Sequence, residues 1–368
     1  MDVVESTLGK SRARLCGCVQ YLNLFGLVIG YSIAAGISMM AIKRSICFQK
    51  NGGKNPCHTN SNPFMIAFGI VEIVFSQILD CNQLWWLSTV AGVMSVICSA
   101  IVLCLGIAQV SENGIIMGSL TGISITTVTP TQKIWRSFLA LQDIAFAFSY
   151  SLILVEIQDT LRSPRSESKK MMKKASRISL TMITLLYLLC GCMGYAAFGD
   201  LSPGNLLTGF GFYNPFWLLD IANAAVIILL VGAYQVYSQP LFAFIENQAE
   251  KIFRGCEFIT KEIEIPFLGY KRKLFTLVWR TLFVITTTII SMFLPYFNHV
   301  VGLFRALGFW PLTIYFPVEM FIKQHRIEKW SMRWLALQVL SSLNFIVTIA
   351  GAVGSIAGIV LDLKSYQS

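Results

Sequence analysis

An acidic residue inside an apolar stretch of membrane-spanning length is the most informative feature of the sequence. Residues 137–155 are apolar and numerous enough to cross a bilayer, yet Gln142 and Asp143 lie within them. An ionised Asp at the centre of a membrane helix costs about 2.5–3.5 kcal/mol, which six or seven apolar neighbours offset at roughly 0.3–0.6 kcal/mol each. The segment can therefore insert, and an acid kept there by default indicates a functional site facing a bundle interior or a wet cavity. The alternative is a structural partner for a neighbouring hydroxyl or backbone group.

The residues that follow Asp143 offer a surface for a small molecule. Residues 145–150 read Ala-Phe-Ala-Phe-Ser-Tyr, which combines small residues for close backbone approach with aromatic rings and two hydroxyls. Other apolar stretches also contain isolated polar residues: Asn23, Glu72, Asp220, Asn223, Gln235 and Arg305. For Tyr21, Asn23 and Asn223 the simpler interpretation is ordinary hydrogen bonding between helices. For Glu72 and Arg305 it is structural pairing, or snorkelling toward a helix end.

The sequence lacks the motifs of membrane enzymes and ATP-driven pumps. A hydrolase or transferase needs a nucleophile with a base, or a metal site, gathered at one depth. No His lies in a long apolar stretch, and neither HExxH, GxSxG nor GxxxxGK[ST] occurs. No selectivity-filter sequence of the kind expected of a channel is found either. We therefore predict that the chain is not an enzyme and takes no cofactor. Isolated polar residues in an apolar bundle are typical of secondary transporters, which bind substrate at mid-membrane.

Composition indicates an integral membrane protein. Of the 368 residues, 55% are apolar and only 13% are charged, against about 25% charged in soluble domains. The net charge of +10 resides largely in short segments between apolar runs, so it indicates membrane orientation and not nucleic-acid binding. Membrane lipid is the expected surrounding partner.

The apolar runs predict an all-α multi-span protein with a single integral membrane domain over residues 1–368. Because a span needs about twenty apolar residues, we place nine spans at residues 15–42, 64–80, 84–109, 137–157, 178–198, 216–244, 275–296, 300–322 and 334–361. The sixth contains Pro240, which predicts a kink or an unwound stretch.

Basic residues predict the orientation of these spans. If the N-terminus is cytoplasmic, the inner segments hold roughly three times as many Lys and Arg as the outer ones, as the positive-inside rule requires. The C-terminus is then extracellular. Cys47 and Cys57 share one predicted outer segment, where a disulfide between them can form.

Several long strings resemble plant amino acid permeases of the amino acid/auxin permease family. They are LQDIAFAFSYSLILVEIQDTL at residues 141–161, and residues 190–226, 232–246, 300–320 and 354–366. The resemblance covers the whole chain. It implies a leucine-transporter-like inverted-repeat bundle and proton-coupled uptake of neutral and acidic amino acids across the plasma membrane, with the proton as coupling ion.

The chain also departs from the family pattern. Relatives begin with a cytoplasmic tail and two further spans, so we expect an N-terminally truncated bundle in which only the second repeat, residues 137–322, is complete. Relatives usually have Gly where Gln142 stands and Pro where Ser149 stands, and many have His where Leu229 stands.

The resemblance assigns roles to the polar and aromatic residues. Asp143 would anchor a broken helix, the backbone of Ala145, Phe146, Ala147 and Phe148 would contact the amino acid, and Phe148 and Tyr150 would act as gates. Tyr21 and Asn23 would face them from the first span, and Asn223 or Gln235 from the sixth. The alternative function is a transport-inactive permease fragment, either non-functional or acting by association with an intact permease chain.

Overall fold

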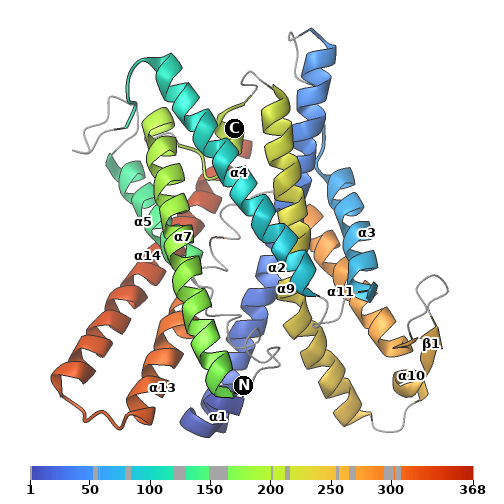
Figure 1. The fold of residues 1–368 in the computed structure, drawn as a ribbon, viewed down its shortest axis with the longest axis vertical. Helices are drawn as coiled ribbons and strands as arrows, with labels where there is room; N and C mark the ends of the chain where they lie inside the picture. Colours follow the sequence, from blue (N-terminus) through green and yellow to red (C-terminus); the bar gives the residue numbers. More distant parts are fainter. Residues whose placement is uncertain are drawn as a thin grey trace. The chain divides into compact units, whose positions relative to one another are not determined.

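The computed structural model describes residues 2–52, 57, 59–78, 84–118, 130–148, 165–199, 202–211, 216–253, 257–264, 271–293, 302 and 308–367. Helices dominate this part of the chain (Figure 1). They are α1 (Asp2–Leu8), α2 (Lys10–Lys50), α3 (Asn62–Ile78), α4 (Leu84–Asn113), α5 (Pro130–Ala147), α7 (Arg165–Phe198), α8 (Leu206–Gly209), α9 (Phe216–Ile252), α10 (Glu257–Thr260), α11 (Leu274–Phe293), the π-helix η2 (Trp310–Tyr315), α13 (Phe316–Gln324) and α14 (Met332–Gln367).

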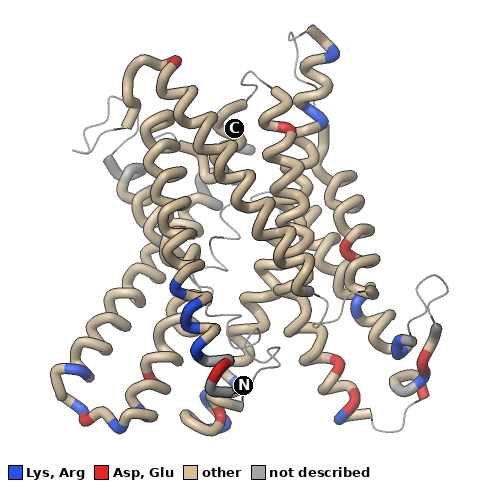
Figure 2. The backbone as a smooth tube through the Cα atoms, in the orientation of Figure 1, with Lys and Arg blue, Asp and Glu red and all other residues tan. Residues whose placement is uncertain are grey.

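Six of these helices are long and apolar enough to cross a membrane. They comprise Lys10–Lys50, Trp85–Asn113, Lys170–Phe198, Phe216–Ile252, Leu274–Phe293 and Met332–Gly358. Helix α3 is apolar but shorter, with 17 residues. Charged residues lie mostly toward the ends of the long helices, as Figure 2 shows. The prediction of an all-α membrane protein is thus confirmed in its general form.

The chain divides into two compact units, each of which is described by itself. Unit 1 comprises Met1–Leu27, Val128–Asp159 and Leu294–Ser368, and unit 2 comprises Val28–Thr127 and Thr160–Phe293. The boundary falls within α2, so Tyr21, Asn23 and Asp143 belong to unit 1, whereas Asn223 and Gln235 belong to unit 2.

In unit 2, α4 packs along α9 and α7, and α3 packs along α11 (Figure 1). Small residues permit this close approach. A Cβ added at Gly232 of α9 would lie 2.7 Å from Cβ of Ala91 in α4, and one added at Gly69 of α3 would lie 2.6 Å from Oγ1 of Thr288 in α11. Apolar lipid gives little drive for helix association, so close contact between such residues supplies much of the packing energy.

In unit 1, α14 packs against α5 and η2. A Cβ at Gly354 of α14 would lie 3.2 Å from Cγ of Leu139 in α5. The indole Nε1 of Trp310 donates to the carbonyl oxygen of Ser341 at 2.9 Å, which fixes η2 to α14. Gly354 begins the sequence Gly-Ser-Ile-Ala-Gly at residues 354–358. Its close neighbour in the structure is α5 of the same chain.

Two local features differ from the sequence prediction or were not foreseen. The sequence predicted a kink or an unwound stretch at Pro240. The unwound stretch is ruled out because α9 is continuous through this residue; one proline removes a single backbone donor, and the flanking turns remain helical. Strands β1 (Glu262–Glu264) and β2 (Lys271–Lys273) form an antiparallel pair with Ile263 opposite Arg272. The alternation of charged and apolar residues is too short there to stand out in the sequence.

The α3–α11 contact gives a first prediction. Gly69→Val places methyl groups against the side chain of Thr288, which lies within 2.6 Å of the new Cβ, and such overpacking costs about 1–3 kcal/mol. We expect a lower apparent melting temperature in detergent, measured as the loss of monodisperse protein after heating. Gly92→Val is the matched control, because nothing lies within 4 Å of a Cβ at this helical glycine. Equal melting temperatures for the two variants would contradict the packing described.

Candidate functional site

A buried polar pair joins α3 to α9 in unit 2. Glu72 and Gln235 are both fully buried. The amide Nε2 of Gln235 donates to Oε2 of Glu72 at 2.6 Å and to the backbone carbonyl of Glu72 at 3.3 Å. Oε1 of Glu72 and Oε1 of Gln235 are buried and have no hydrogen-bond partner in the part of the chain that the structure describes. Snorkelling of Glu72 is thus excluded, and the pairing interpretation is the one that fits.

The neighbouring residue of α9 forms a second polar contact. The hydroxyls of Tyr234 and Thr287 lie 2.9 Å apart, and both residues are fully buried. The Tyr234 ring packs edge-on against Phe68 of α3, with ring centroids 5.9 Å apart. Successive residues of α9 therefore bind two different helices, α3 through Gln235 and α11 through Tyr234.

An ion pair between the buried Arg280 and the partly buried Glu246 adds to these polar contacts. Arg280 of α11 donates from Nε to Oε1 of Glu246 in α9 at 2.9 Å and from Nη1 to the carbonyl of Ser76 in α3 at 2.8 Å. Its guanidinium also lies over the Phe242 ring, 5.1 Å from the centroid. The charge is thus neutralised and its donors are used, which is what burial of an ion pair requires. We call the contacts of Glu72, Gln235, Tyr234, Thr287, Arg280 and Glu246 the polar seam.

The ion pair of the polar seam yields a second prediction. Arg280→Ala leaves the partly buried Glu246 and the buried carbonyl of Ser76 without their donor, and hydrogen bonds to charged groups contribute about 1.5–3 kcal/mol each. We expect a large loss of folded protein on heating in detergent.

The control is Lys273→Ala, which removes the partner of Glu250 in a pair whose side chains are 45% and 46% exposed. Exposed pairs contribute about 0–1 kcal/mol, so this variant should melt close to the parent. A similar loss in both variants would show that burial of Arg280 does not matter.

Unit 2 contains a second group of polar residues, which includes Asn223 and lies nearer the N-terminal end of α9 than the polar seam does. Asn223 is buried and donates from Nδ2 to the carbonyl of Leu219 at 2.9 Å. One turn earlier, Asp220 accepts from Oγ of Ser45 in α2 at 3.2 Å. Asn223 and Gln235 therefore do not meet: Asn223 lines a pocket with Asp220, and Gln235 binds Glu72.

In unit 1, Asn23 lies against Gly308. Asn23 is 4% exposed, and a Cβ added at Gly308 would come within 2.5 Å of its side-chain carbon Cγ. Oδ1 of Asn23 has no hydrogen-bond partner among the described residues. Tyr21, two residues earlier in α2, is half-buried. Gly308 thus supplies the room that this polar side chain needs.

The predicted centre of the site falls on α5 and its C-terminal end. Asp143 is exposed within the structure, and Ala147 and Phe148 are half-buried. The backbone of Ala145 and Phe146 is helical, while their side chains and the whole of Tyr150 lie outside the described residues, as does Arg305. The assembly of all predicted substrate-binding residues into one site stays a prediction.

The polar seam was only partly visible in the sequence. Glu72 and Gln235 were recognised as isolated polar residues, but their pairing spans 163 positions and leaves no local signal. Tyr234, Ser238 and Gln239 were missed, although adjacent polar residues recurring one turn apart in α9 indicate a buried polar face. The described residues contain no cluster of three or more His, Cys, Asp or Glu that could hold a metal ion.

The structure places Cys47 and Cys57 within disulfide-bonding distance, with Cα atoms 6.1 Å apart. We predict that a membrane-impermeant maleimide labels the parent protein on intact cells only after an impermeant reductant is added. Cys57→Ser should be labelled at Cys47 without reductant, because the predicted loop is extracellular.

The double variant Cys47→Ser/Cys57→Ser is the control and should gain no label in either condition. Labelling of the parent without reductant would contradict the disulfide, and a Cys57→Ser variant that is never labelled would contradict the outer location.

The sequence model of a family described as "Transmembrane amino acid transporter protein" matches residues 1–361. The chain is 66% identical over 370 residues to Amino acid permease 3 of Arabidopsis thaliana, with 100% of this chain and 78% of the relative covered. It is 62% identical to Amino acid permease 4 and 47% identical to Amino acid permease 1 of the same plant, again over 100% of this chain, with 79% and 76% of those relatives covered.

Proposed function

The chain belongs to the family of transmembrane amino acid transporter proteins, and on that premise we propose that it carries amino acids across the plasma membrane in symport with protons. The observation that carries the proposal is the family match over residues 1–361. Relatives named as amino acid permeases support the substrate class. Proton coupling and the plasma membrane rest on the family resemblance.

The polar residues buried in apolar helices support a transport function. In a membrane helix, polar and ionisable groups are rare and mark substrate or ion pathways when they face a bundle interior. Glu72 and Asn23 each have a buried oxygen without a hydrogen-bond partner among the described residues. Such groups are costly unless a ligand, an ion or water uses them, and a transporter supplies these.

We further propose the arrangement that the family resemblance implies. The bundle is an inverted repeat of the leucine-transporter type, with the N-terminus cytoplasmic and the C-terminus extracellular. Asp143 anchors the substrate-binding helix, and the backbone of residues 145–148 contacts the amino acid. Tyr21, Asn23, Asn223 and Gln235 are the residues proposed to face it, with Phe148 and Tyr150 as gates.

The test is uptake of a labelled neutral amino acid by the full chain, in cells that lack their own amino acid permeases. We expect saturable uptake that is faster at about pH 5 than at about pH 7 and that a protonophore abolishes. Asp143→Ala should lower uptake at least about tenfold, since losing a hydrogen bond to a charged group costs roughly 1.5–3 kcal/mol.

Surface labelling confirms delivery of each protein, and Glu328→Ala is the matched control. Glu328 is an exposed carboxylate in the turn before α14, so its removal should leave uptake unchanged. Surface-delivered parent protein without uptake would overturn the transport proposal. Co-purification with an intact permease would then test the alternative of an associating, transport-inactive chain.

A further inference from the structure

Unit 2 contains a pocket that neither the sequence analysis nor the family comparison assigns. Its volume is about 230 Å³, and it lies between the C-terminal part of α2, the short helix α8 and the first turns of α9. A water molecule takes about 30 Å³ of liquid volume, so the pocket has room for a small organic molecule. Its polar lining residues are Arg44, Ser45, Asn205, Thr208, Asp220 and Asn223.

The pocket carries one positive and one negative side chain. Arg44 donates from Nη2 to the carbonyl of Thr59 at 3.2 Å. Asp220 accepts at Oδ2 from Ser45 at 3.2 Å. Nε of Arg44 and Oδ1 of Asp220 are both buried and lack a hydrogen-bond partner among the residues the structure describes. Each charged group is thus held in place by a hydrogen bond, and both side chains line the pocket.

Neighbouring groups hold these two side chains in place. Ser45, which donates to Asp220, itself accepts from Nε2 of Gln49 one turn further along α2 at 3.4 Å. Asn205 caps α8, because its Oδ1 accepts from the backbone N–H of Leu207 at 3.1 Å. The anionic side and the α8 side of the pocket are therefore preorganised.

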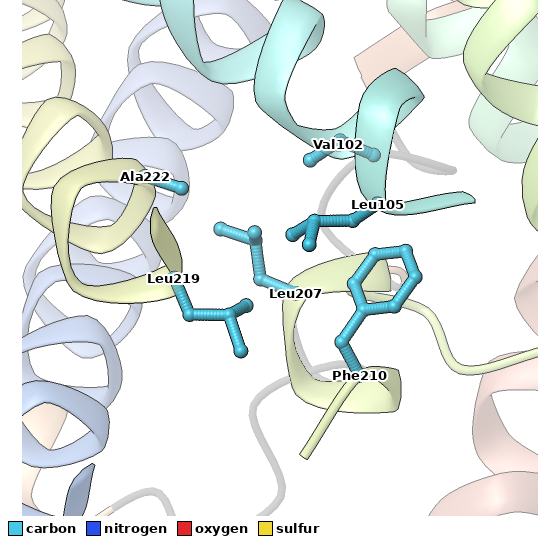
Figure 3. Close-up of a cluster of buried hydrophobic side chains, with 6 residues drawn as sticks. All are labelled: Val102, Leu105, Leu207, Phe210, Leu219 and Ala222. Atoms are coloured by element: carbon cyan, nitrogen blue, oxygen red, sulfur yellow. The ribbon is translucent and has the colours of Figure 1, made fainter. Parts of the chain in front are cut away.

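An apolar core lies behind the pocket (Figure 3). Leu207 and Leu219 line it and also belong to a buried cluster with Val102, Leu105, Phe210 and Ala222. Figure 3 shows side chains from α4, α8 and α9 converging in this cluster. Packing against α4 thus fixes α8 and the start of α9 on one side of the pocket.

We propose that this pocket binds a free zwitterionic α-amino acid, with the ammonium group on Asp220 and the carboxylate on Arg44. A purely anionic ligand would meet Asp220, and a purely cationic one would meet Arg44, so a ligand with both charges matches the lining best. The apolar lining, which includes Ile37, Met40 and Phe216, receives an uncharged side chain. Arg suits a carboxylate because its planar donors match the two oxygens.

The pocket acts as a loading site at the predicted outer end of the bundle. Arg44 and Ser45 precede Cys47 by three and two residues, in the segment that the charge distribution places outside. The inference rests on the proposed amino acid transport, and it shares only Asn223 with the residues predicted to bind substrate at mid-membrane. Its role is to capture the amino acid before transport.

Occupancy can be measured without transport. Thr208 is exposed and lines the pocket, so Thr208→Cys gives a thiol that a membrane-impermeant maleimide can modify in the full-length protein. We expect L-alanine to slow this modification several-fold, whereas N-acetyl-alanine and alanine methyl ester, each lacking one charge, do not. Ser202→Cys is the control: Ser202 is exposed but does not line the pocket, so alanine should leave its modification rate unchanged. Label on native thiols is subtracted with the parent protein.

Charge-neutralising variants test the two contacts. In the Thr208→Cys background, Arg44→Gln and Asp220→Asn should each raise the alanine concentration needed for protection at least about tenfold. Lys43→Gln, which removes an exposed neighbouring charge, should not. In uptake assays the same two variants should raise KM with little change in the maximal rate.

The outcomes separate this inference from the transport proposal. Uptake by the parent protein without protection of Thr208→Cys by alanine overturns the loading site and leaves transport intact. Protection without uptake supports the site and overturns transport. Protection that survives both Arg44→Gln and Asp220→Asn overturns the assigned contacts. If one variant fails to reach the surface, the other carries the test.

Discussion

The contact between Gln235 and Glu72 is the constraint on which the organisation of unit 2 depends. An acidic side chain in a membrane helix must find a polar partner, since lipid offers none. Gln235 meets this need by binding both the carboxylate and the backbone carbonyl of Glu72. That requirement fixes α3 against α9 at one rotation and one height, and the adjacent Tyr234 then reaches Thr287 of α11.

Close helix approach and polar pairing depend on each other in this unit. Gly69 lies in α3 one turn before Glu72, and it allows Thr288 of α11 to approach the α3 backbone. Without that approach the carbonyl of Ser76 would not lie 2.8 Å from Arg280. Gly232 plays the corresponding part in α9, where it contacts Ala91 of α4. The small residues thus provide the distances at which hydrogen bonds between helices can form.

Sequence patterns predicted those features that are encoded locally. Apolar runs indicated the long helices, and basic loops and permease-like strings indicated a membrane transporter. The pairing of Glu72 with Gln235 could not be predicted, since it joins residues 163 positions apart. Pro240 alone could not decide between a kink and an unwound stretch, because the effect of one proline depends on the turns around it; α9 stays helical there. The separation of Asn223 from Gln235 follows from the helix itself, since twelve residues at 1.5 Å each span about 18 Å. Their partners, the carbonyl of Leu219 for Asn223 and Glu72 for Gln235, could not be predicted.

The charged residues of unit 2 fall into two kinds that imply different roles. Arg280 is matched by Glu246, a backbone carbonyl and an aromatic ring, so its positive charge is satisfied within the fold and serves packing. Arg44 and Asp220 lie in one pocket, but each keeps a buried polar atom without a partner among the described residues. Opposite charges that line one pocket are better explained by a ligand that carries both charges than by packing between helices. In this bundle a charge that is matched within the fold, as for Arg280, serves packing, whereas the opposite charges of Arg44 and Asp220 line one pocket.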